Sequence, residues 1–295
     1  MQAQGLIDTT GLIDAIGAYF QQEGLYESHI PGLKMYRCDS DIPRQPAIYH
    51  PSLCVVAQGD KQIWFGDYSH TYDAEHYLLN SMTFPIEAAV INASADTPYL
   101  GLILEIDATI VSQLMAKMEQ HIHYEKVKKG QEVVTSTRIS PLMIQQLVRL
   151  VELESNAMDR DILADGIKRE IFYEVLKGPY GCLLRNCVDQ HSGAHRIAPV
   201  VHFIEQNYQQ ALDIDTIAEV ANMSPSTLYE HFKAVTSLSP VQFIKNLRLH
   251  RARNLLMSGE KASDACYSVG YSSPSQFSRE FKRLFGCSPR EIRSY

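Results

Sequence analysis

The chain has 295 residues, of which 45% are hydrophobic and 21% charged, with a net charge of −7; this composition is typical of a globular protein and excludes intrinsic disorder. Its length predicts two domains, no apolar run is long enough to cross a bilayer, and the N-terminus lacks the basic and then apolar order of a signal peptide. Six cysteines without regular spacing predict reduced thiols, so we expect a cytoplasmic protein with no membrane partner.

Residues 33–106 are predicted to form short β-strands. Alternating or apolar runs such as LKMYRC and SLCVVAQ recur there, and turn signals such as QGDK and SADTP separate them. The run SHTYDAEHYLLN is read as one strand. Many short strands at this spacing predict a sandwich or a small barrel.

Three helices are predicted after the strands. The first starts behind a possible N-cap at Asp107, the second covers 139–151, and the third covers 163–175 and ends before Gly178 and Pro179. Apolar stripes of this kind are typical of a protein core, but part of this surface could instead form a dimer interface.

Residues 178–195 are predicted to form a short helix and then a linker with a Cys-x4-Cys-x3-His-x3-His spacing, made by Cys182, Cys187, His191 and His195. If the last three continue one helix, they span about 12 Å, too far for ligands that each lie about 2 Å from one zinc ion. Gly193 could break that helix, but we predict no metal and no cofactor.

A 17-residue segment of the sequence is repeated near the C-terminus. The segment SPSTLYEHFKAVTSLSP at 224–240 returns as SPSQFSREFKRLFGCSP at 273–289. Charge is also divided unevenly, because residues 1–195 carry 15 Lys and Arg against 25 Asp and Glu, whereas residues 196–295 carry 12 against 9. A basic end behind an acidic body is either an accident of composition or a module that binds a polyanion.

Each copy of this repeated segment predicts a capped helix. Ser224 and Ser273 are N-cap candidates, each is followed by Pro, and Gln276 lies where a capping box would need it. A short helix and a tight turn precede each copy, which is the helix-turn-helix arrangement. Two such units joined by one helix can place two recognition helices in successive major grooves about 34 Å apart.

The last hundred residues resemble the AraC/XylS-type DNA-binding domain. The connector SPVQFIKNLRLHRARNLL matches at Pro240, Phe243, Ile244, Arg248, Leu249, Ala252, Leu255 and Leu256. The closing stretch matches at Gly270, Tyr271, Ser275, Phe277, Arg279, Phe281, Lys282, Arg283, Gly286, Ser288, Pro289 and Arg293. Ala262, Ala265 and Cys266 depart from the pattern, which implies a looser core in the second helix-turn-helix motif. Ile292 replaces the usual aromatic before Arg293, which should only alter packing.

The segments IPGLKMYR, YHPSLCVVAQGDKQIWFGD and YLGLILEID resemble the cupin-like regulatory domain of an AraC subgroup. The resemblance implies an α+β protein: residues 1–190 form a cupin-like β-barrel with following helices that sense and oligomerise, and residues 191–295 form an all-α domain with two helix-turn-helix motifs. It implies a transcription regulator that binds double-stranded DNA and takes an unidentified small-molecule effector. Homodimer formation and contact with RNA polymerase are further expectations.

Two sets of candidate DNA contacts follow from the repeat and the resemblance. Base contacts are predicted for Ser226, Tyr229, Glu230, Gln276 and Arg279, because these side chains lie opposite the apolar pairs, and Arg can read a guanine edge. Phosphate contacts are predicted for Lys233, Lys282, Arg283 and Arg290. The alternatives are an ion pair of Arg279 with Glu280 or Glu230, a purely capping role for Gln276, and solvated charge for the others.

Candidates for an effector pocket are Tyr49, Cys54, Trp64, Tyr77 and Tyr99, with ordinary core packing as the alternative. Cys38 and Cys54 could react with electrophiles, although the apolar run around Cys54 favours burial. A cupin-type metal-dependent enzyme is the competing function. His70, Glu75 and His76 cluster in sequence, but strand alternation would turn Glu75 away from the two histidines, and no common catalytic motif is present, so no enzyme is predicted.

Overall fold

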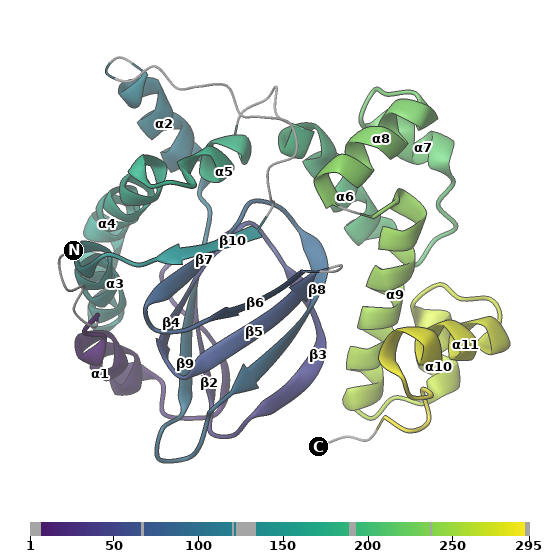
Figure 1. Cartoon of the computed structure of the whole chain (residues 1–295), viewed down its shortest axis with the longest axis horizontal. Helices are drawn as coiled ribbons and strands as arrows, with labels where there is room; N and C mark the ends of the chain where they lie inside the picture. The colour runs from purple at the N-terminus through teal and green to yellow at the C-terminus, as the bar shows by residue number, and fades with distance from the viewer. Residues whose placement is uncertain are drawn as a thin grey trace. The chain divides into compact units, whose positions relative to one another are not determined.

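The computed structural model describes residues 7–65, 68–119, 121, 134–188, 193–236 and 238–292 (Figure 1). These residues group into two compact units, with the main division between His195 and Arg196. We call them the first unit and the second unit. The predicted domain boundary at 190 stays a prediction.

The first unit contains most of the β-structure, with helices before and after it. Its strands are β1 (Gly24–Glu27), β2 (Leu33–Cys38), β3 (Ile42–Tyr49), β4 (Ser52–Gln58), β5 (Asp60–Phe65), β6 (Tyr68–Tyr72), β7 (His76–Asn80), β8 (Phe84–Ile91), β9 (Tyr99–Glu105) and β10 (Val134–Arg138). They pair into a six-stranded sheet in the order β1-β2-β9-β4-β7-β10 and a four-stranded sheet in the order β3-β8-β5-β6. This confirms the predicted α+β class, whereas closure into a single barrel is not detected among the strands described.

Among the described residues, five α-helices accompany these sheets: α1 (Thr10–Tyr19), α2 (Ala108–Met118), α3 (Pro141–Glu152), α4 (Ala157–Lys177) and α5 (Gly181–Asn186), with a 3-10 turn η1 (Leu153–Ser155) after α3. The three predicted helices are confirmed as α2, α3 and α4, and Asp107 caps α2 by accepting hydrogen bonds from two backbone amides. The sequence reading missed α1, β1 and β10. None of the described helices has the length and apolar character that a bilayer span requires.

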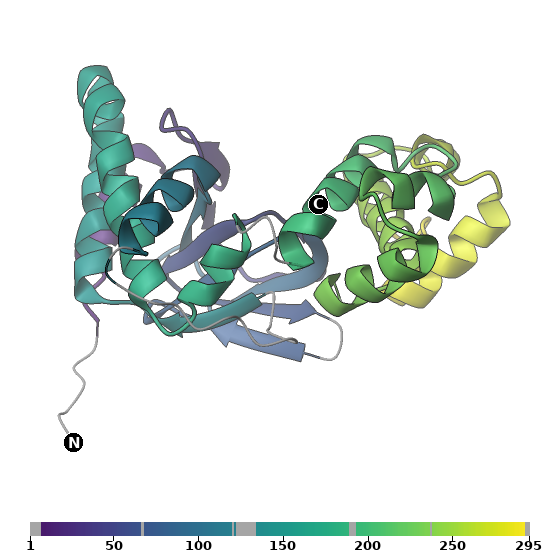
Figure 2. The same cartoon turned by 90° about the horizontal axis from the view of Figure 1, so that it is seen from above.

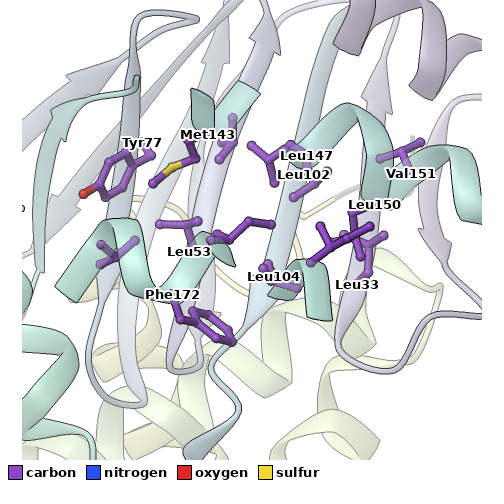
Figure 3. Packing of buried hydrophobic residues seen from close by; sticks show 14 of the residues in the cluster. Leu33, Leu53, Tyr77, Leu102, Leu104, Met143, Leu147, Leu150, Val151 and Phe172 are labelled. Atoms are coloured by element: carbon purple, nitrogen blue, oxygen red, sulfur yellow. The ribbon is translucent and has the colours of Figure 1, made fainter. Parts of the chain in front are cut away.

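The core of the first unit lies between the six-stranded sheet and the helices (Figure 3). Leu53, Leu102 and Leu104 point from β4 and β9 toward Leu147 of α3 and Phe172 of α4, and all are at most 1% exposed. Strand alternation explains the choice of residues, because every second side chain of a strand faces the same side of the sheet. The odd-numbered residues of β4 and the even-numbered residues of β9 therefore face the helices.

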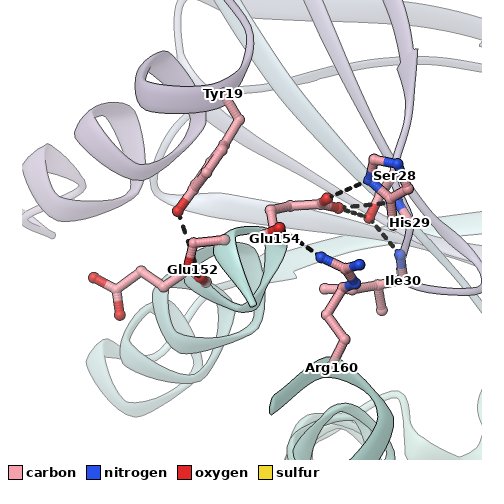
Figure 4. A network of polar contacts seen from close by, with 8 residues as sticks. Tyr19, Ser28, His29, Ile30, Glu152, Glu154 and Arg160 are labelled. Atoms are coloured by element: carbon pink, nitrogen blue, oxygen red, sulfur yellow. Dashed lines mark hydrogen bonds and ion pairs between the residues drawn. The ribbon is translucent and has the colours of Figure 1, made fainter. Parts of the chain in front are cut away.

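A buried carboxylate ties the start of the sheet to the end of α3 (Figure 4). The Oε1 atom of Glu154 accepts hydrogen bonds from the hydroxyl of Ser28 and from the backbone amide of His29, the latter at 3.1 Å. The His29 Nδ1 atom lies 3.0 Å from Oε2, and Arg160 donates to the Glu154 carbonyl at 2.6 Å. The contacts from Ser28 and His29 satisfy the carboxylate of Glu154, a residue that is only 8% exposed, as burial of a polar group requires.

From α6 onward the described chain is helical (Figure 2). Its helices are α6 (Gly193–Asn207), α7 (Ile214–Val220), α8 (Pro225–Thr236), α9 (Pro240–Met257), α10 (Ala262–Ser268) and α11 (Pro274–Phe285). Two aromatic groups anchor the packing. The Phe232 and Phe243 rings meet edge to face at 5.4 Å, and the Phe281 and Phe285 rings do so at 4.5 Å.

Candidate nucleic-acid interface

Helices α7 with α8, and α10 with α11, form two helix-turn-helix units that α9 connects. In both units the first helix ends in the same way: the residue after the C-cap, Asn222 or Gly270, has a positive φ of 51° or 87°. The amides of Met223 and Tyr271 then donate back to helix carbonyls three residues from the end, at 3.0 and 3.1 Å. This is the Schellman closure, which turns the chain sharply into the second helix.

The second helix of each unit starts as predicted. Ser224 Oγ accepts a hydrogen bond from the Thr227 amide, and Ser273 Oγ accepts one from the Gln276 amide, both at 3.3 Å. The full capping box is wrong for the second copy, because the Gln276 side chain donates to Glu280 at 3.2 Å and does not accept a hydrogen bond from the Ser273 amide. The apolar pairs are confirmed as anchors, since all four members are at most 1% exposed: Leu228, Phe232, Phe277 and Phe281.

The predicted DNA-contacting side chains lie on the opposite faces of these helices. All of them are exposed: Ser226, Tyr229, Glu230 and Lys233 on α8, Gln276, Arg279, Lys282 and Arg283 on α11, and Arg290 after α11. Within the described part of the chain, no hydrogen bond or ion pair engages the Arg279 side chain. The alternative of an ion pair between Arg279 and Glu280 or Glu230 is therefore not realised among those residues.

Glu280 instead joins three segments of the second unit. It accepts hydrogen bonds from the Tyr271 hydroxyl at 2.8 Å and from Gln276, and it pairs with the ammonium of Lys245 at 3.0 Å. Partial burial raises the pKa of the Glu280 carboxyl, but the hydrogen bonds from Tyr271, Lys245 and Gln276 outweigh it and lower the pKa below its ordinary value. This contact fixes α11 against α9 and the preceding turn.

The connector helix α9 also holds the segment that follows α6. The guanidinium of Arg248 donates to the carbonyls of Tyr208 and Gln210, each at 2.6 Å, and lies 6.0 Å from the Tyr271 ring centroid. Between those two carbonyls, the backbone of Gln209 lies against Gly270: a Cβ at Gly270 would be 2.3 Å from the Gln209 oxygen. The sequence reading matched Arg248 and Gly270 to a family pattern but assigned neither a partner.

One titratable side chain of α9 is buried without a polar partner. His250 is 5% exposed, packs edge to face on Phe285 at 5.6 Å, and its Nδ1 atom makes no hydrogen bond among the described residues. Burial, with a smaller contribution from the charge of Arg253, lowers the pKa of His250 to about 3. The imidazole is therefore neutral near pH 7 and serves as an apolar contact inside the unit.

The effector-pocket candidates fall on different faces of the two sheets. Tyr49, Cys54 and Tyr99 lie between the sheets and are at most 8% exposed. Tyr77 packs with the core on the helix-facing side of β7, where burial raises its pKa to about 12. Trp64 follows the buried Ile63 on β5, so strand alternation turns it to the opposite face of the sheet. There the Cζ atom of Arg44 lies 4.5 Å from the centroid of the Trp64 ring.

The cysteines between the sheets are buried thiols. Cys38 and Cys54 are 1% and 4% exposed, and burial raises the pKa of both thiols. A reactive thiol needs exposure and a lowered pKa, so both observations disfavour the electrophile-sensing alternative.

The candidate metal ligands are used otherwise. His70 lies on β6 and His76 on β7, so they belong to different sheets, and reading the run between them as one strand was wrong: it turns at 73–75. His70 Nε2 lies 3.1 Å from Ser136 Oγ, His76 Nδ1 lies 2.7 Å from Asp73, and Glu75 pairs with Arg138 at 3.3 Å. Among the described residues, no group of three or more His, Cys, Asp or Glu could hold a metal ion.

Of the candidate metal ligands in the linker, the structure describes the side chains of Cys182 and Cys187. Cys187 donates to the carbonyl of Leu183 at 3.3 Å, and burial raises its pKa to about 12, which disfavours the thiolate that a metal needs. His191 and the side chain of His195 lie outside the described residues.

A β-sheet unit with covering helices, followed by two matched helix-turn-helix motifs on one connector helix, defines a two-part transcription regulator. Residues 29–182 match the family described as "AraC-type transcriptional regulator N-terminus", and residues 217–295 match a "Helix-turn-helix domain". The chain therefore belongs to the AraC-type transcriptional regulators, a family of transcription factors and not of enzymes.

Relatives support this assignment in sequence and in fold. The chain is 30% identical over 161 residues to the transcriptional activator RhaS of Escherichia coli strain SE11, which is 53% of this chain and 56% of RhaS. It thus spans about half the length of the curated relatives it matches. An apo variant of ToxT from Vibrio cholerae shares the fold with a TM-score of 0.62 at 13% identity, over 90% of this chain and 98% of ToxT. ToxT with a bound unsaturated fatty acid gives 0.54 at 13% identity, over 88% and 93%.

Proposed function

We propose that this protein binds specific sequences of double-stranded DNA through α8 and α11, and that a small molecule held by the first unit controls its effect on transcription. The observation that carries the proposal is the pair α8 and α11: each follows the same Schellman closure of the preceding helix, starts at a serine cap, and exposes its polar face while its apolar face is buried. Two helices connected by one rigid helix can enter successive major grooves. One chain can then read two neighbouring sub-sites.

The roles of single residues follow from exposure and charge. Arg279 has an exposed guanidinium without a partner among the described residues, so it is free to bind a guanine edge with two hydrogen bonds. Lys233, Lys282, Arg283 and Arg290 supply exposed positive charge for phosphates. Glu230 repels phosphate and accepts only from a base amino group, so α8 reads fewer bases than α11.

Arg279→Ala is expected to weaken binding to the cognate site by about 1–3 kcal/mol and to relax specificity at one base pair. Duplexes selected from a random pool by the purified protein supply the cognate site, and mobility-shift titrations measure the affinity. Lys282→Ala is the matched control from the same helix: it should weaken all sequences alike and reduce the salt slope by about one unit. Unchanged affinity and specificity in Arg279→Ala would contradict the proposed base contact. Failure of the unmodified protein to select any sequence would contradict the proposed function.

Control by a small molecule is supported by the first unit and by a relative. A crystal structure of ToxT contains a bound unsaturated fatty acid, and this chain shares the ToxT fold. The effector must bind two arrangements of the protein with different affinity, because only such a difference shifts the equilibrium between them. The shift changes which DNA spacing is bound, or how RNA polymerase is contacted.

Helix α4 supplies the surface proposed for a homodimer. Met158, Ile162 and Tyr173 are 64%, 68% and 40% exposed, and they recur along the helix at intervals that keep apolar side chains on a common side. Two copies of this surface can bury each other, as a symmetric dimer requires.

Ile162→Glu is therefore expected to convert a dimer into a monomer, because it places a charge in an apolar contact. Sedimentation equilibrium of the intact protein measures the change. Asp161→Lys, at the neighbouring exposed position, is the control for a charge change on the same helix. A monomer before any substitution, or a dimer that survives Ile162→Glu, would contradict the assigned surface.

A further inference from the structure

Lys61 places an ammonium group among tyrosine rings between the two sheets. Its Nζ atom lies 5.4 Å from the ring centroid of Tyr49 on β3 and 5.8 Å from those of Tyr36 on β2 and Tyr99 on β9. The Tyr36 and Tyr99 rings also meet each other edge to face at 6.1 Å. Residues from both sheets thus surround one positive charge.

This charge lacks an opposite charge in the surrounding structure. Within the described residues, Lys61 takes part in no ion pair. Burial raises the pKa of the Tyr36, Tyr72 and Tyr99 hydroxyls, so these neighbours are neutral phenols near pH 7. Lys61 is partly exposed, so its ammonium is partly desolvated; such a cation without a counter-charge is costly, and ring faces compensate only part of that cost.

Two buried hydroxyls share this space. The Tyr49 hydroxyl interacts electrostatically with Lys61 and Tyr72, but neither the Tyr49 nor the Tyr72 hydroxyl makes a hydrogen bond of ordinary geometry in the described part of the chain, although both residues are at most 8% exposed. Buried hydroxyls normally find an acceptor. A carboxylate between the sheets would accept from both hydroxyls and pair with the ammonium.

We propose that Lys61, Tyr49 and Tyr72 bind the carboxylate of a small organic acid whose apolar or aromatic body lies between the two sheets. The inference rests on the effector role in the proposed function and adds the chemical class of the effector. The aromatic rings of Tyr36 and Tyr99 suit such a body, and the missing counter-charge selects an anion over its neutral analogue. A neutral amide leaves Lys61 unpaired and is bound more weakly.

The test titrates the intact protein calorimetrically with benzoate, phenylacetate, hexanoate and octanoate, each beside its amide. At least one acid is expected to bind, at least tenfold more tightly than its amide. Lys61→Met should lose at least tenfold in affinity, and Tyr72→Phe, which keeps the ring and removes only the hydroxyl, should lose about threefold to tenfold. The Lys61→Met variant should keep its far-UV circular dichroism spectrum.

Binding of no acid, equal binding of acid and amide, or unchanged binding by both Lys61→Met and Tyr72→Phe would overturn the inference. If Lys61→Met is misfolded, Tyr72→Phe alone decides. A mobility shift with the selected duplex separates this result from the proposed function. Intact DNA binding with failed acid binding rejects only the site, whereas an unmodified protein that selects no DNA rejects the function on which the site depends.

Discussion

Gly270→Ala is expected to destabilise the second unit by about 3 kcal/mol or more and to abolish specific DNA binding. Two costs combine at this position. The backbone has φ of 87°, where a side chain costs about 1 kcal/mol, and the added Cβ would lie 2.3 Å from the oxygen and 2.8 Å from the carbonyl carbon of Gln209. Because both atoms belong to the backbone, no rotamer change relieves the overlap.

Urea unfolding measures this loss unit by unit. The chain has a single tryptophan, Trp64, which lies in the first unit and reports its unfolding by fluorescence, while far-UV circular dichroism also follows the helices of the second unit. Gly259→Ala is the matched control: its φ is 93°, but no atom lies within 4 Å of the added Cβ. It should cost only about 1 kcal/mol. Equal losses for the two variants would show that Gln209 does not constrain Gly270.

Local signals explain which elements could be predicted. A helix cap involves residues three apart, so Ser224 and Ser273 reveal the starts of α8 and α11 without knowledge of the rest of the fold. Apolar residues four apart likewise identify the buried faces. Gln276 shows the limit of that reasoning, because its side chain has two candidate partners at short range and Glu280, already held by distant groups, is the one it contacts.

Contacts between distant segments could not be read in this way. The fragment around His70 and His76 alternates like one strand, but its two halves belong to different sheets, and only the strand pairing shows this. Four of the five effector candidates are aromatic residues in predicted strands, and the register places two of these, Tyr77 and Tyr99, on opposite faces of one sheet. Lys61 was missed because a lysine in a strand is normally exposed, and nothing nearby in sequence indicates its tyrosine neighbours.

Arg248→Ala is expected to destabilise the second unit by about 2–3 kcal/mol, since it removes two hydrogen bonds from a charged donor and leaves the carbonyls of Tyr208 and Gln210 without that partner. Arg248→Lys should recover little of this loss, because one ammonium lacks the planar fork that reaches two carbonyls. Urea unfolding followed by circular dichroism gives both values. Arg283→Ala, which removes an equal charge from an exposed position of α11, should stay within about 0.5 kcal/mol of the unmodified protein.

The combination of Arg248→Ala with Gly270→Ala tests whether both residues hold the same segment. Arg248 binds the carbonyls on either side of Gln209, and the absence of a side chain at Gly270 leaves room for the backbone of Gln209. If either contact is lost, the segment at 208–210 can move, and the other contact then contributes less to stability. The double variant should therefore lose at least about 0.5 kcal/mol less than the sum of the single losses. Strict additivity would mean that the two residues act on separate parts of the unit, and that the segment at 208–210 does not link α9 to the second helix-turn-helix motif.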